Sequence, residues 1–530
     1  MMSAFAKEIV SKRYFHEGET TWDDVARRVV REVFSAVPAP QDLRDAAYEL
    51  IRDRKFMPGG RYLASAGRQY HQTQNCFLAR AEDSREGWAD LVRKATLVLM
   101  TGGGFGVVYS ALREKGAYLR RVNGTSSGPL ALMQMINEVG RGAMAGGSRR
   151  AALWAGLRWD HPDIFDFIRM KDWSPEVHAL KAKDFSFPAM MDHTNISVCL
   201  DDRFFEAYYA GVHRAREVYD AVMVSALITG EPGFSIDIGD DAGEDLRNPC
   251  TEITSHNTDD CCNLGSINLA RIESLAEMQT AVEVGTAFLL AGTVYSDVPY
   301  PEVAVVRAKN RRLGLGLLGV HEFLLKLGRQ YGPDDELRRY LEIYTESRAY
   351  AGMWSCQWGL SESIKTRAVA PTGTIGIVAE TTTGAEPIFC AAYRRRYFDR
   401  GEWRAQYVLD PTARRLVAAG MNQGQIEDAY SIPVDRRLAM QAWIQLYVDH
   451  AISSTVNLPP WDGDLDRVQA TGETLMQHLR GLRGVTFYPD GARGGQPLER
   501  CSWREAEGRE GEVVVEGGDV CDLRGGTCGA

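Results

Sequence analysis

The sequence lacks the features that mark membrane, secreted and nucleic-acid-binding proteins. None of its apolar runs reaches the roughly 18 residues of a membrane span, and its first residues contain no signal-peptide core. Its net charge of −10 gives no overall electrostatic attraction to DNA, RNA or an acidic membrane. We therefore expect a cytoplasmic protein with neither a nucleic-acid nor a membrane partner.

Cysteine is sparse, and its spacing excludes the common structural uses of thiols. Ten cysteines in 530 residues are too few for a secreted disulfide scaffold. No Cys-x-x-Cys pair and no His-rich ligand set is present, which argues against a metal site. Redox or radical chemistry therefore explains the cysteines better. They stand at positions 76, 199, 250, 261, 262, 356, 390, 501, 521 and 528.

The common nucleotide-binding loops are also missing. No Gly-x-x-x-x-Gly-Lys-Ser/Thr loop occurs, and the glycine-rich turn at 101–107 lacks the spacing of a dinucleotide fingerprint. No fixed-period repeat is present either. These absences disfavour a P-loop enzyme and a string of repeated modules.

The remaining pattern predicts three regions in an α/β protein. A capping box at Thr21 and valines at helical spacing predict a helix over 21–37, and a second helix is expected around 41–54. Residues 60–460 alternate short apolar runs with amphipathic segments and Gly-rich turns. From Arg500 the chain is rich in Gly, Glu and Arg. We expect a helical N-terminal region (1–57), a catalytic domain (58–499) and a flexible tail (500–530).

The run from Asn248 to Glu252 contains the residues with the clearest chemical potential. An extended backbone would place Asn248, Cys250 and Glu252 on one face, and Pro249 predicts a loop tip or a strand end. A thiolate nucleophile would need a nearby cation, and His256 is the only local candidate. A neutral thiyl radical needs none, so the segment suits hydrogen-atom chemistry at least as well. A buried free cysteine is the alternative.

Two turns are candidates for binding phosphate. The turn at 371–376 follows an apolar run and offers backbone amides and two hydroxyls, with a plain turn as the alternative. The loop at 146–150 is glycine-rich and basic, with a solvated surface loop as the alternative.

Taken in this order, these segments resemble the catalytic subunit of ribonucleotide reductases over nearly the whole chain. The resemblance rests on the run 248–252, similar to the family's finger loop, on 262–268, similar to its second redox-cysteine strand, and on 370–374, similar to its substrate-phosphate turn. The segments 160–164 and 312–316 are also family-like.

The resemblance implies a ten-stranded α/β barrel with a central finger loop and a thiyl-radical mechanism. Cys250 would abstract the ribose 3′ hydrogen, Glu252 would act as general base on the 3′ hydroxyl, and Asn248 would hydrogen-bond the sugar. Cys76 and Cys262 would supply two electrons and form a disulfide, with Cys261 as the alternative to Cys262. The substrate-binding residues implied are Ser65, Asn75, Thr372, Gly373, Thr374 and Ile375.

The tail cysteines have an implied role as well. Cys521 and Cys528 would reduce the active-site disulfide by exchange and be reduced in turn by thioredoxin or glutaredoxin. Six residues separate them, which is wider than the usual tail pair, so Cys501 is an alternative partner.

The radical source separates two branches of the family. The segments 61–67, 393–396 and 484–491 resemble the class II branch, which uses adenosylcobalamin. The alternative is a class I subunit, which takes its radical from a separate protein through two adjacent tyrosines near the C-terminus. No adjacent tyrosines occur in 480–530, and Tyr208-Tyr209 lies in an unrelated helical segment.

Regulation by deoxynucleoside triphosphates is implied by two further segments. The effector-binding residues would be Asp83, Ser84, Gly147, Arg149 and Arg150. In family dimers this site lies at the subunit interface, so we expect a homodimer. We expect no ATP-cone and therefore no overall switch by dATP. The sequence leaves open whether diphosphates or triphosphates are reduced.

Overall fold

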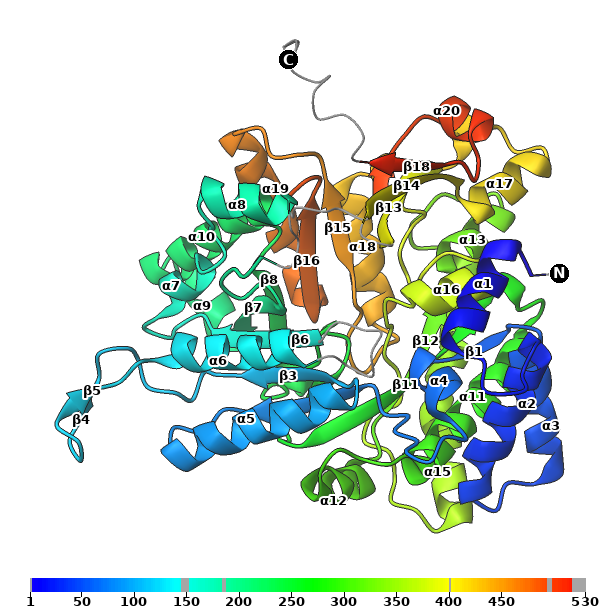
Figure 1. Cartoon of the computed structure of the whole chain (residues 1–530), viewed down its shortest axis with the longest axis horizontal. Coiled ribbons are helices and arrows are strands. Elements are labelled where there is room, and N and C mark those ends of the chain that lie inside the picture. The colour runs from blue at the N-terminus through cyan, green and yellow to red at the C-terminus, as the bar shows by residue number, and fades with distance from the viewer. Residues whose placement is uncertain (1, 144–151, 184–186, 400–401, 493–497, 517–530) are drawn as a thin grey trace, which may run out of the picture.

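The computed structural model describes residues 2–143, 152–183, 187–399, 402–492 and 498–516 (Figure 1). Five residues named above therefore lie outside the described residues. They are Gly147, Arg149, Arg150, Cys521 and Cys528.

The centre of the fold is one sheet of ten strands. In sheet order its strands are β1 (Phe56–Pro58), β11 (Asp260–Asn268), β2 (Cys76–Arg80), β3 (Gly104–Val108), β6 (Ala152–Arg158), β7 (Thr194–Asp201), β8 (Gly233–Asp237), β16 (Gly484–Pro489) and β15 (Thr455–Leu458), and β12 (Leu313–Leu318) also pairs with β11. The run from β2 to β8 is parallel, and antiparallel pairing joins β2 to β11 and β8 to β16. The predicted α/β class and the ten strands are confirmed.

Continuous strand pairing does not close this sheet into a barrel among the described residues. Two isolated bridges lie between its ends: Arg367 pairs with Leu315 of β12, and Val369 pairs with Ile452 just before β15. The segment around residue 367 thus connects the two ends of the sheet without forming a strand of its own.

Helices pack around the strands. In chain order they are α1 (Ala4–Arg13), α2 (Trp22–Val33), α3 (Gln41–Arg52), α4 (Gly60–Ser65), α5 (Arg85–Met100), α6 (Pro129–Gly142), α7 (Ile164–Ile168), α8 (Pro175–Lys183), α9 (Asp202–Tyr209), α10 (His213–Thr229), α11 (Leu275–Tyr295), α12 (Pro301–Asn310), α13 (Val320–Lys326), α14 (Asp335–Thr345), α15 (Ser347–Trp358), α16 (Gly373–Ala379), α17 (Pro411–Ala418), α18 (Val434–Gln445), α19 (Leu465–His478) and α20 (Trp503–Gly508). Thr21 and Asp24 form the predicted capping box of α2.

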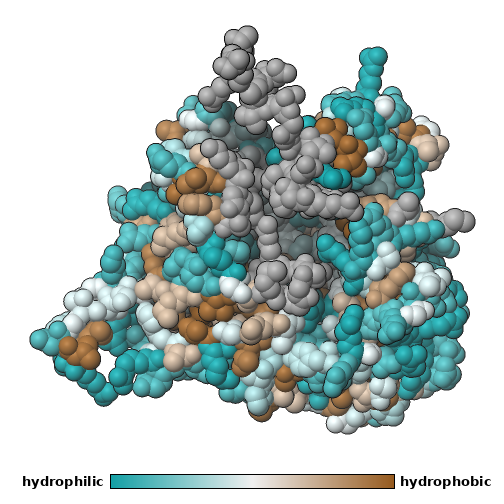
Figure 2. Space-filling model, viewed as in Figure 1, coloured by the Kyte–Doolittle hydropathy of each residue, from teal (hydrophilic) through white to brown (hydrophobic). Residues whose placement is uncertain are grey.

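Two large apolar cores lie between the sheet and these helices. One joins α1, α2 and α3 to α11 and to strands β1, β11 and β12; the other joins α5, α6 and α10 to the parallel strands. The N-terminal helices therefore share a core with the sheet rather than having their own. Figure 2 shows a largely hydrophilic outer face with hydrophobic residues scattered in small groups. No described helix is long and apolar enough to span a membrane.

A smaller apolar cluster occupies the inner side of the sheet. It contains Leu78, Val108, Trp154, Cys199, Leu246, Ile253, Cys262, Leu264, Ala368 and Ala370. Successive strand residues point to opposite faces, so Cys262 belongs to this inner cluster while Cys261 belongs to an outer core. Leu246 and Ile253 come from a hairpin, β9 (Leu246–Arg247) and β10 (Thr254–Ser255), which lies inside the sheet.

Glycines on β3 make room for this hairpin, which is the predicted finger loop. A Cβ atom at Gly106 would lie 1.7 Å from the carbonyl oxygen of Arg247, and one at Gly104 would lie 2.9 Å from the Pro249 ring. The hairpin backbone therefore packs directly on the backbone of β3, at a separation that no side chain at position 106 permits.

A second sheet follows near the C-terminus and differs from the expected flexible tail. Its order is β17 (Leu498–Arg500), β13 (Ala392–Asp399), β14 (Glu402–Leu409) and β18 (Val513–Glu516), and α20 packs on β14. The expectation of a flexible segment beginning at residue 500 is therefore wrong for residues 500–516. The β-branched run Val513–Val515 adds to the free edge of β14, which explains the order. The two short strands β4 (Tyr118–Leu119) and β5 (Gly124–Thr125) form a hairpin that projects from the body (Figure 1).

The contact at Gly106 makes a direct prediction about stability. We expect Gly106→Ala to lower the free energy of unfolding by about 1–3 kcal/mol or more, because the added methyl group displaces the hairpin. Gly352→Ala is the control, since no heavy atom lies within 4 Å of its added Cβ in α15. The free energy of unfolding of that variant, measured in urea, should rise by about 0.5–1 kcal/mol. Equal effects of the two substitutions would contradict the packing described.

Candidate active site

The finger tip is a tight turn that carries Cys250. The Thr251 N–H donates to the Asn248 carbonyl oxygen (2.9 Å), and Thr251 has a φ of +66°. The prediction of a loop tip is confirmed, whereas the extended backbone expected for 248–252 is wrong. Pro249 sits inside the turn, where its fixed φ is favourable and its missing N–H costs nothing.

The turn still gathers the three predicted side chains. The Asn248 amide donates to the Cys76 sulfur atom (3.0 Å), and its Oδ1 atom accepts from the Ile253 N–H (2.9 Å). Glu252 lies close enough to raise the pKa of the Cys250 thiol, after the larger effect of burial. One thiol, one carboxyl group and one amide therefore face Cys76.

Two strands place Cys76 and Cys262 directly opposite each other. They are register partners in the antiparallel pair β2 and β11, and the Asn75 N–H donates to the Cys262 carbonyl oxygen (3.1 Å). Direct antiparallel partners have Cα atoms about 4.5–5.5 Å apart, which is within the range of a disulfide. Cys261 pairs with Phe77 and faces the outer core. The geometry favours Cys262 over Cys261 as the partner of Cys76.

All three thiols are held in the neutral form. Burial raises the pKa of the Cys76 and Cys262 thiols above the ordinary value, and desolvation by the surrounding protein, together with Glu252, raises the pKa of Cys250. The Cys250 side chain is nevertheless exposed, so another molecule can reach it. A protonated, accessible thiol is a poor nucleophile and a suitable hydrogen-atom donor.

Glu252 is the group near these thiols that titrates near neutrality. Burial raises its pKa from 4.5 to about 7, and the nearby Asn248 amide opposes this shift. It is 1% exposed, and its Oε2 atom has no hydrogen-bond partner among the described residues. A carboxyl group with this pKa can both accept and return a proton at neutral pH.

Several other buried polar atoms around the thiols lack partners in the described part of the chain. They are both amide atoms of Gln74 and Oδ1 of Asn75. Each buried polar group left unpaired costs about 1–3 kcal/mol. Such a concentration beside the thiols indicates a site for a polar ligand.

The predicted phosphate turn begins helix α16, and the segment before it reaches the inner cluster. Thr372 has a φ of +50°, its hydroxyl group accepts from the Gly384 N–H (2.7 Å), and Gly373, Thr374 and Ile375 form the first turn of the helix. Ala370 lies in the same apolar cluster as Cys262. Ser65 ends α4, whose Tyr62 hydroxyl accepts from the Asn263 amide (2.6 Å). Both segments are thus anchored near β11.

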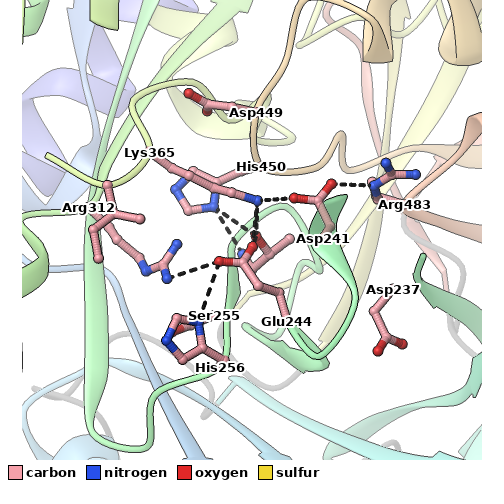
Figure 3. A network of polar contacts seen from close by, with 12 residues as sticks. Asp237, Asp241, Glu244, Ser255, His256, Arg312, Lys365, Asp449, His450 and Arg483 are labelled. Atoms are coloured by element: carbon pink, nitrogen blue, oxygen red, sulfur yellow. Dashed lines mark hydrogen bonds and ion pairs between the residues drawn. The ribbon is translucent and has the colours of Figure 1, made fainter. Parts of the chain in front are cut away.

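A buried arginine joins the finger loop to strand β11 (Figure 3). Arg312 is 1% exposed; its Nε atom donates to Asp260 (2.7 Å) and its Nη2 atom donates to Glu244 (3.0 Å). Asp260 is the first residue of β11, two positions before Cys262, and Glu244 accepts from the Thr254 hydroxyl of the finger (2.6 Å). Arg312 therefore fixes the strand of one thiol relative to the loop of another.

The same network continues on the other side of the finger base. Lys365 forms ion pairs with Asp241 and Glu244, and Arg483 pairs with Asp241 at 2.7 Å. His450 accepts the Thr254 N–H through Nδ1 (3.1 Å), and burial lowers its pKa, which keeps the ring neutral. Of these residues, only Arg312 lies in a segment that the sequence motifs mark.

A separate cavity of about 1000 Å³ contains the two described effector candidates. Asp83 accepts from Arg113 (2.8 Å), and the Ser84 hydroxyl caps α5 through the Gly87 N–H (2.9 Å). The lining also includes Tyr118, Arg120 and Arg121. Arg120 and Arg121 give the cavity a basic wall. Neither is among the effector-binding residues expected from the sequence, although two adjacent arginines were a visible signal there.

Comparison with known proteins identifies the family. The model of the ribonucleotide reductase barrel domain matches residues 74–215, 209–362 and 356–488. This chain belongs to the ribonucleotide reductase family. The resemblance found in its sequence is thereby confirmed.

Individual relatives agree with this assignment. The chain is 29% identical over 518 residues to the vitamin B12-dependent ribonucleoside-diphosphate reductase of Mycobacterium tuberculosis, covering 85% of this chain and 72% of the relative. It is also 29% identical over 545 residues to a Mycobacterium phage D29 protein named for adenosylcobalamin-dependent ribonucleoside-triphosphate reduction, covering 84% and 75%. The class Id ribonucleotide reductase alpha subunit of Actinobacillus ureae superposes with a TM-score of 0.74 at 16% identity, over 92% of this chain and 97% of that one, which shows a shared fold.

The raised pKa of Glu252 predicts a pH-dependent change in stability. Because the folded state favours the protonated carboxyl group, its stability falls as pH rises from 4.5 through about 7. We expect Glu252→Gln to unfold like the parent at pH 4.5 but to be more stable at pH 8, by on the order of 3 kcal/mol. Glu17→Gln, at an exposed position, is the control. A Glu252→Gln effect independent of pH in urea unfolding would refute the assigned pKa.

The position of Arg312 predicts a large loss of stability on its removal. Arg312→Ala leaves Asp260 and Glu244 buried without their shared cation, so the free energy of unfolding should fall by about 3–5 kcal/mol. The control Arg27→Ala removes an exposed i,i+4 pair with Asp23 and should cost less than about 1 kcal/mol. Chemical denaturation measures both. Similar losses in the free energy of unfolding for the two variants would show that the buried network does not stabilise the fold as described.

Proposed function

We propose that this chain reduces ribonucleotides to 2′-deoxyribonucleotides for DNA synthesis, by a thiyl radical on Cys250 generated with adenosylcobalamin. The observation that carries the proposal is the arrangement of the finger tip, where Cys250 and Glu252 face the opposed pair Cys76 and Cys262. Family membership and the names of the relatives support the same reading.

The proposed residues divide the reaction between them. The Cys250 radical takes the 3′ hydrogen atom of the ribose, and Glu252 takes the proton of the 3′ hydroxyl group. The Asn248 amide, which donates to Cys76 in this structure, holds the sugar. The 2′ hydroxyl group leaves as water while Cys76 and Cys262 give up two electrons and two hydrogens and become a disulfide. Cys250 then returns its hydrogen atom to the 3′ carbon and is left as the radical again, and Glu252 returns the proton to the 3′ oxygen.

Neutral thiols suit this chemistry. The pKa of all three cysteines is raised, so each carries the hydrogen that the proposed mechanism transfers. Glu252, with a pKa of about 7, is ionised in enough molecules at neutral pH to act as a base. The remaining unpaired atoms of Gln74 and Asn75 would supply hydrogen bonds for a polar substrate.

The cofactor assignment rests on the accessible Cys250 thiol and on the relatives. When bound, adenosylcobalamin supplies the organic radical that removes the hydrogen atom of Cys250. An exposed and protonated thiol fits this role. The second candidate is a class I-type subunit served by a separate radical-generating protein, and the absence of adjacent tyrosines from 480–530 disfavours it.

Substrate binding is proposed for two segments beside β11. The turn of Thr372, Gly373, Thr374 and Ile375 would hold phosphate through the amides that begin α16. Ser65 and Asn75 would contact the remainder of the nucleotide, and the free Oδ1 atom of Asn75 supports this role. The relatives include both diphosphate and triphosphate reductases, so turnover must decide between the two substrates.

Regulation is proposed for the basic cavity near Asp83. A deoxynucleoside triphosphate would bind there through its phosphates to Arg120 and Arg121, near Asp83 and Ser84. Gly147, Arg149 and Arg150 would connect this effector to the substrate base, and the protein would act as a homodimer.

The external electron supply is proposed to use the C-terminal cysteines. Cys521 and Cys528 would reduce the Cys76–Cys262 disulfide by exchange, and thioredoxin or glutaredoxin would restore them. Such a cycle needs a reducing compartment, which favours the cytoplasm.

Anaerobic turnover tests the proposed function and its cofactor together. The purified chain is given CDP or CTP, dithiothreitol and a deoxynucleotide effector, with and without adenosylcobalamin. We expect deoxycytidine product only with the cofactor, and from one of the two substrates preferentially. The Cys250→Ala variant should form none. Product that forms only after a radical-generating subunit is added would instead support the class I-type candidate.

A further inference from the structure

Two cysteines outside the candidate active site meet at the edge of the small sheet. Cys390 precedes β13 and Cys501 follows β17. Tyr393 and Arg500 are register partners in this antiparallel pair, so Ala392 stands opposite Cys501. The Ala392 carbonyl oxygen accepts both the Cys390 S–H (2.9 Å) and the Cys501 N–H (3.2 Å). One oxygen atom therefore lies between the two residues.

The two thiols differ in accessibility. Cys390 is 5% exposed, whereas Cys501 is partly exposed and packs with Trp503 against the apolar group formed by Ala392, Leu409 and Ala506. An accessible thiol beside a buried one is the arrangement needed for exchange, in which the first attacks a disulfide and the second resolves the mixed disulfide.

We propose that Cys390 and Cys501 form a second dithiol site, whose substrate is the disulfide of the chain's own C-terminal cysteines. The proposal rests on the proposed reductase function, in which that disulfide forms at each turnover. It gives Cys501 a role beside Cys390 in place of the role of a substitute tail cysteine.

The exchange conserves atoms and electrons. Cys501, after losing its proton, attacks one sulfur of the Cys521–Cys528 disulfide, whose S–S bond breaks and whose leaving thiolate takes up a proton. Cys390 then attacks Cys501 in the mixed disulfide and releases the second tail cysteine as a thiol. Cys390 and Cys501 lose two electrons and become a disulfide, and the tail gains two electrons and two protons.

The local environment favours electron flow toward the tail. Burial first, and then the neighbouring Glu505 and Cys390, raise the pKa of Cys501 to about 11. Burial also raises the pKa of Cys390. A dithiol whose thiolates are not stabilised is a stronger reductant than one with a low pKa. The raised pKa values also make attack slow, so the pair acts as a reserve rather than as the main supply.

The chain is long enough for this encounter. Strands β17 and β18 form the two edges of the small sheet and lie about 14 Å apart. Cys501, at the end of β17, and Glu516, at the end of β18, are also offset by about 20 Å along the strand direction. The twelve residues that follow Glu516, up to Cys528, can span at most about 40 Å.

Counting product without added reductant tests the proposal. The fully reduced chain is freed of dithiothreitol and incubated anaerobically with substrate, effector and adenosylcobalamin until product stops forming. Each dithiol yields one deoxynucleotide, so we expect three per chain. Cys501→Ser and Cys390→Ser should each lower the yield by a third. Cys356→Ser, an exposed cysteine on α15, is the matched control and should leave it unchanged.

A second measurement separates failure of this proposal from failure of the proposed function. The parent chain is equilibrated with oxidised dithiothreitol, its free thiols are alkylated, and its peptides are mapped by mass spectrometry. A Cys390–Cys501 crosslink supports the dithiol even if no nucleotide is reduced. Two products per chain in the parent and in both variants, with Cys390 and Cys501 alkylated throughout, would overturn it while leaving the reductase intact.

Discussion

The contact between the finger hairpin and the backbone of β3 is the constraint on which the rest of the site depends. A side chain at Gly106 would overlap the Arg247 carbonyl oxygen, so the hairpin can approach the strand only because that position has no Cβ. This approach brings Cys250 to the strands that carry Cys76 and Cys262. Arg312 then fixes the hairpin from its other side, through its bond to Glu244 (Figure 3) and its bond to Asp260 of β11. Steric contact and buried charge together set one position for the finger tip.

The electrostatics of the site agree with chemistry that moves hydrogen atoms. Burial desolvates the thiols of Cys76 and Cys262 and keeps them protonated, and the pKa of the accessible Cys250 thiol is raised as well. Protonated thiols would disable a thiolate enzyme but suit radical transfer. The same desolvation brings Glu252 to a pKa near neutrality. The charged groups lie instead at the base of the finger, where Lys365, Arg312 and their carboxylate partners neutralise one another. Charge thus holds the loop in place, and the tip remains nearly uncharged.

Much of this arrangement could be predicted from local sequence, and the remainder depends on contacts distant in the chain. The α2 helix, the loop tip at Pro249 and the ten-stranded α/β fold were predictable from spacing, proline chemistry and family motifs. The choice between Cys261 and Cys262 required the register of β11 against β2. The network around Glu244 joins residues up to about 240 positions apart, and no local pattern signals it. The ordered strand β18 was missed because a short valine run gains its stability only from the edge of β14.

The most direct test of the account is disulfide mapping after a single turnover. A chain carrying Cys521→Ser and Cys528→Ser is reduced, freed of reductant and given nucleotide and adenosylcobalamin without oxygen. The account predicts one Cys76–Cys262 disulfide for each deoxynucleotide formed, with Cys261 left as a free thiol. Product formed without that disulfide, or with Cys261 in its place, would contradict the site as described.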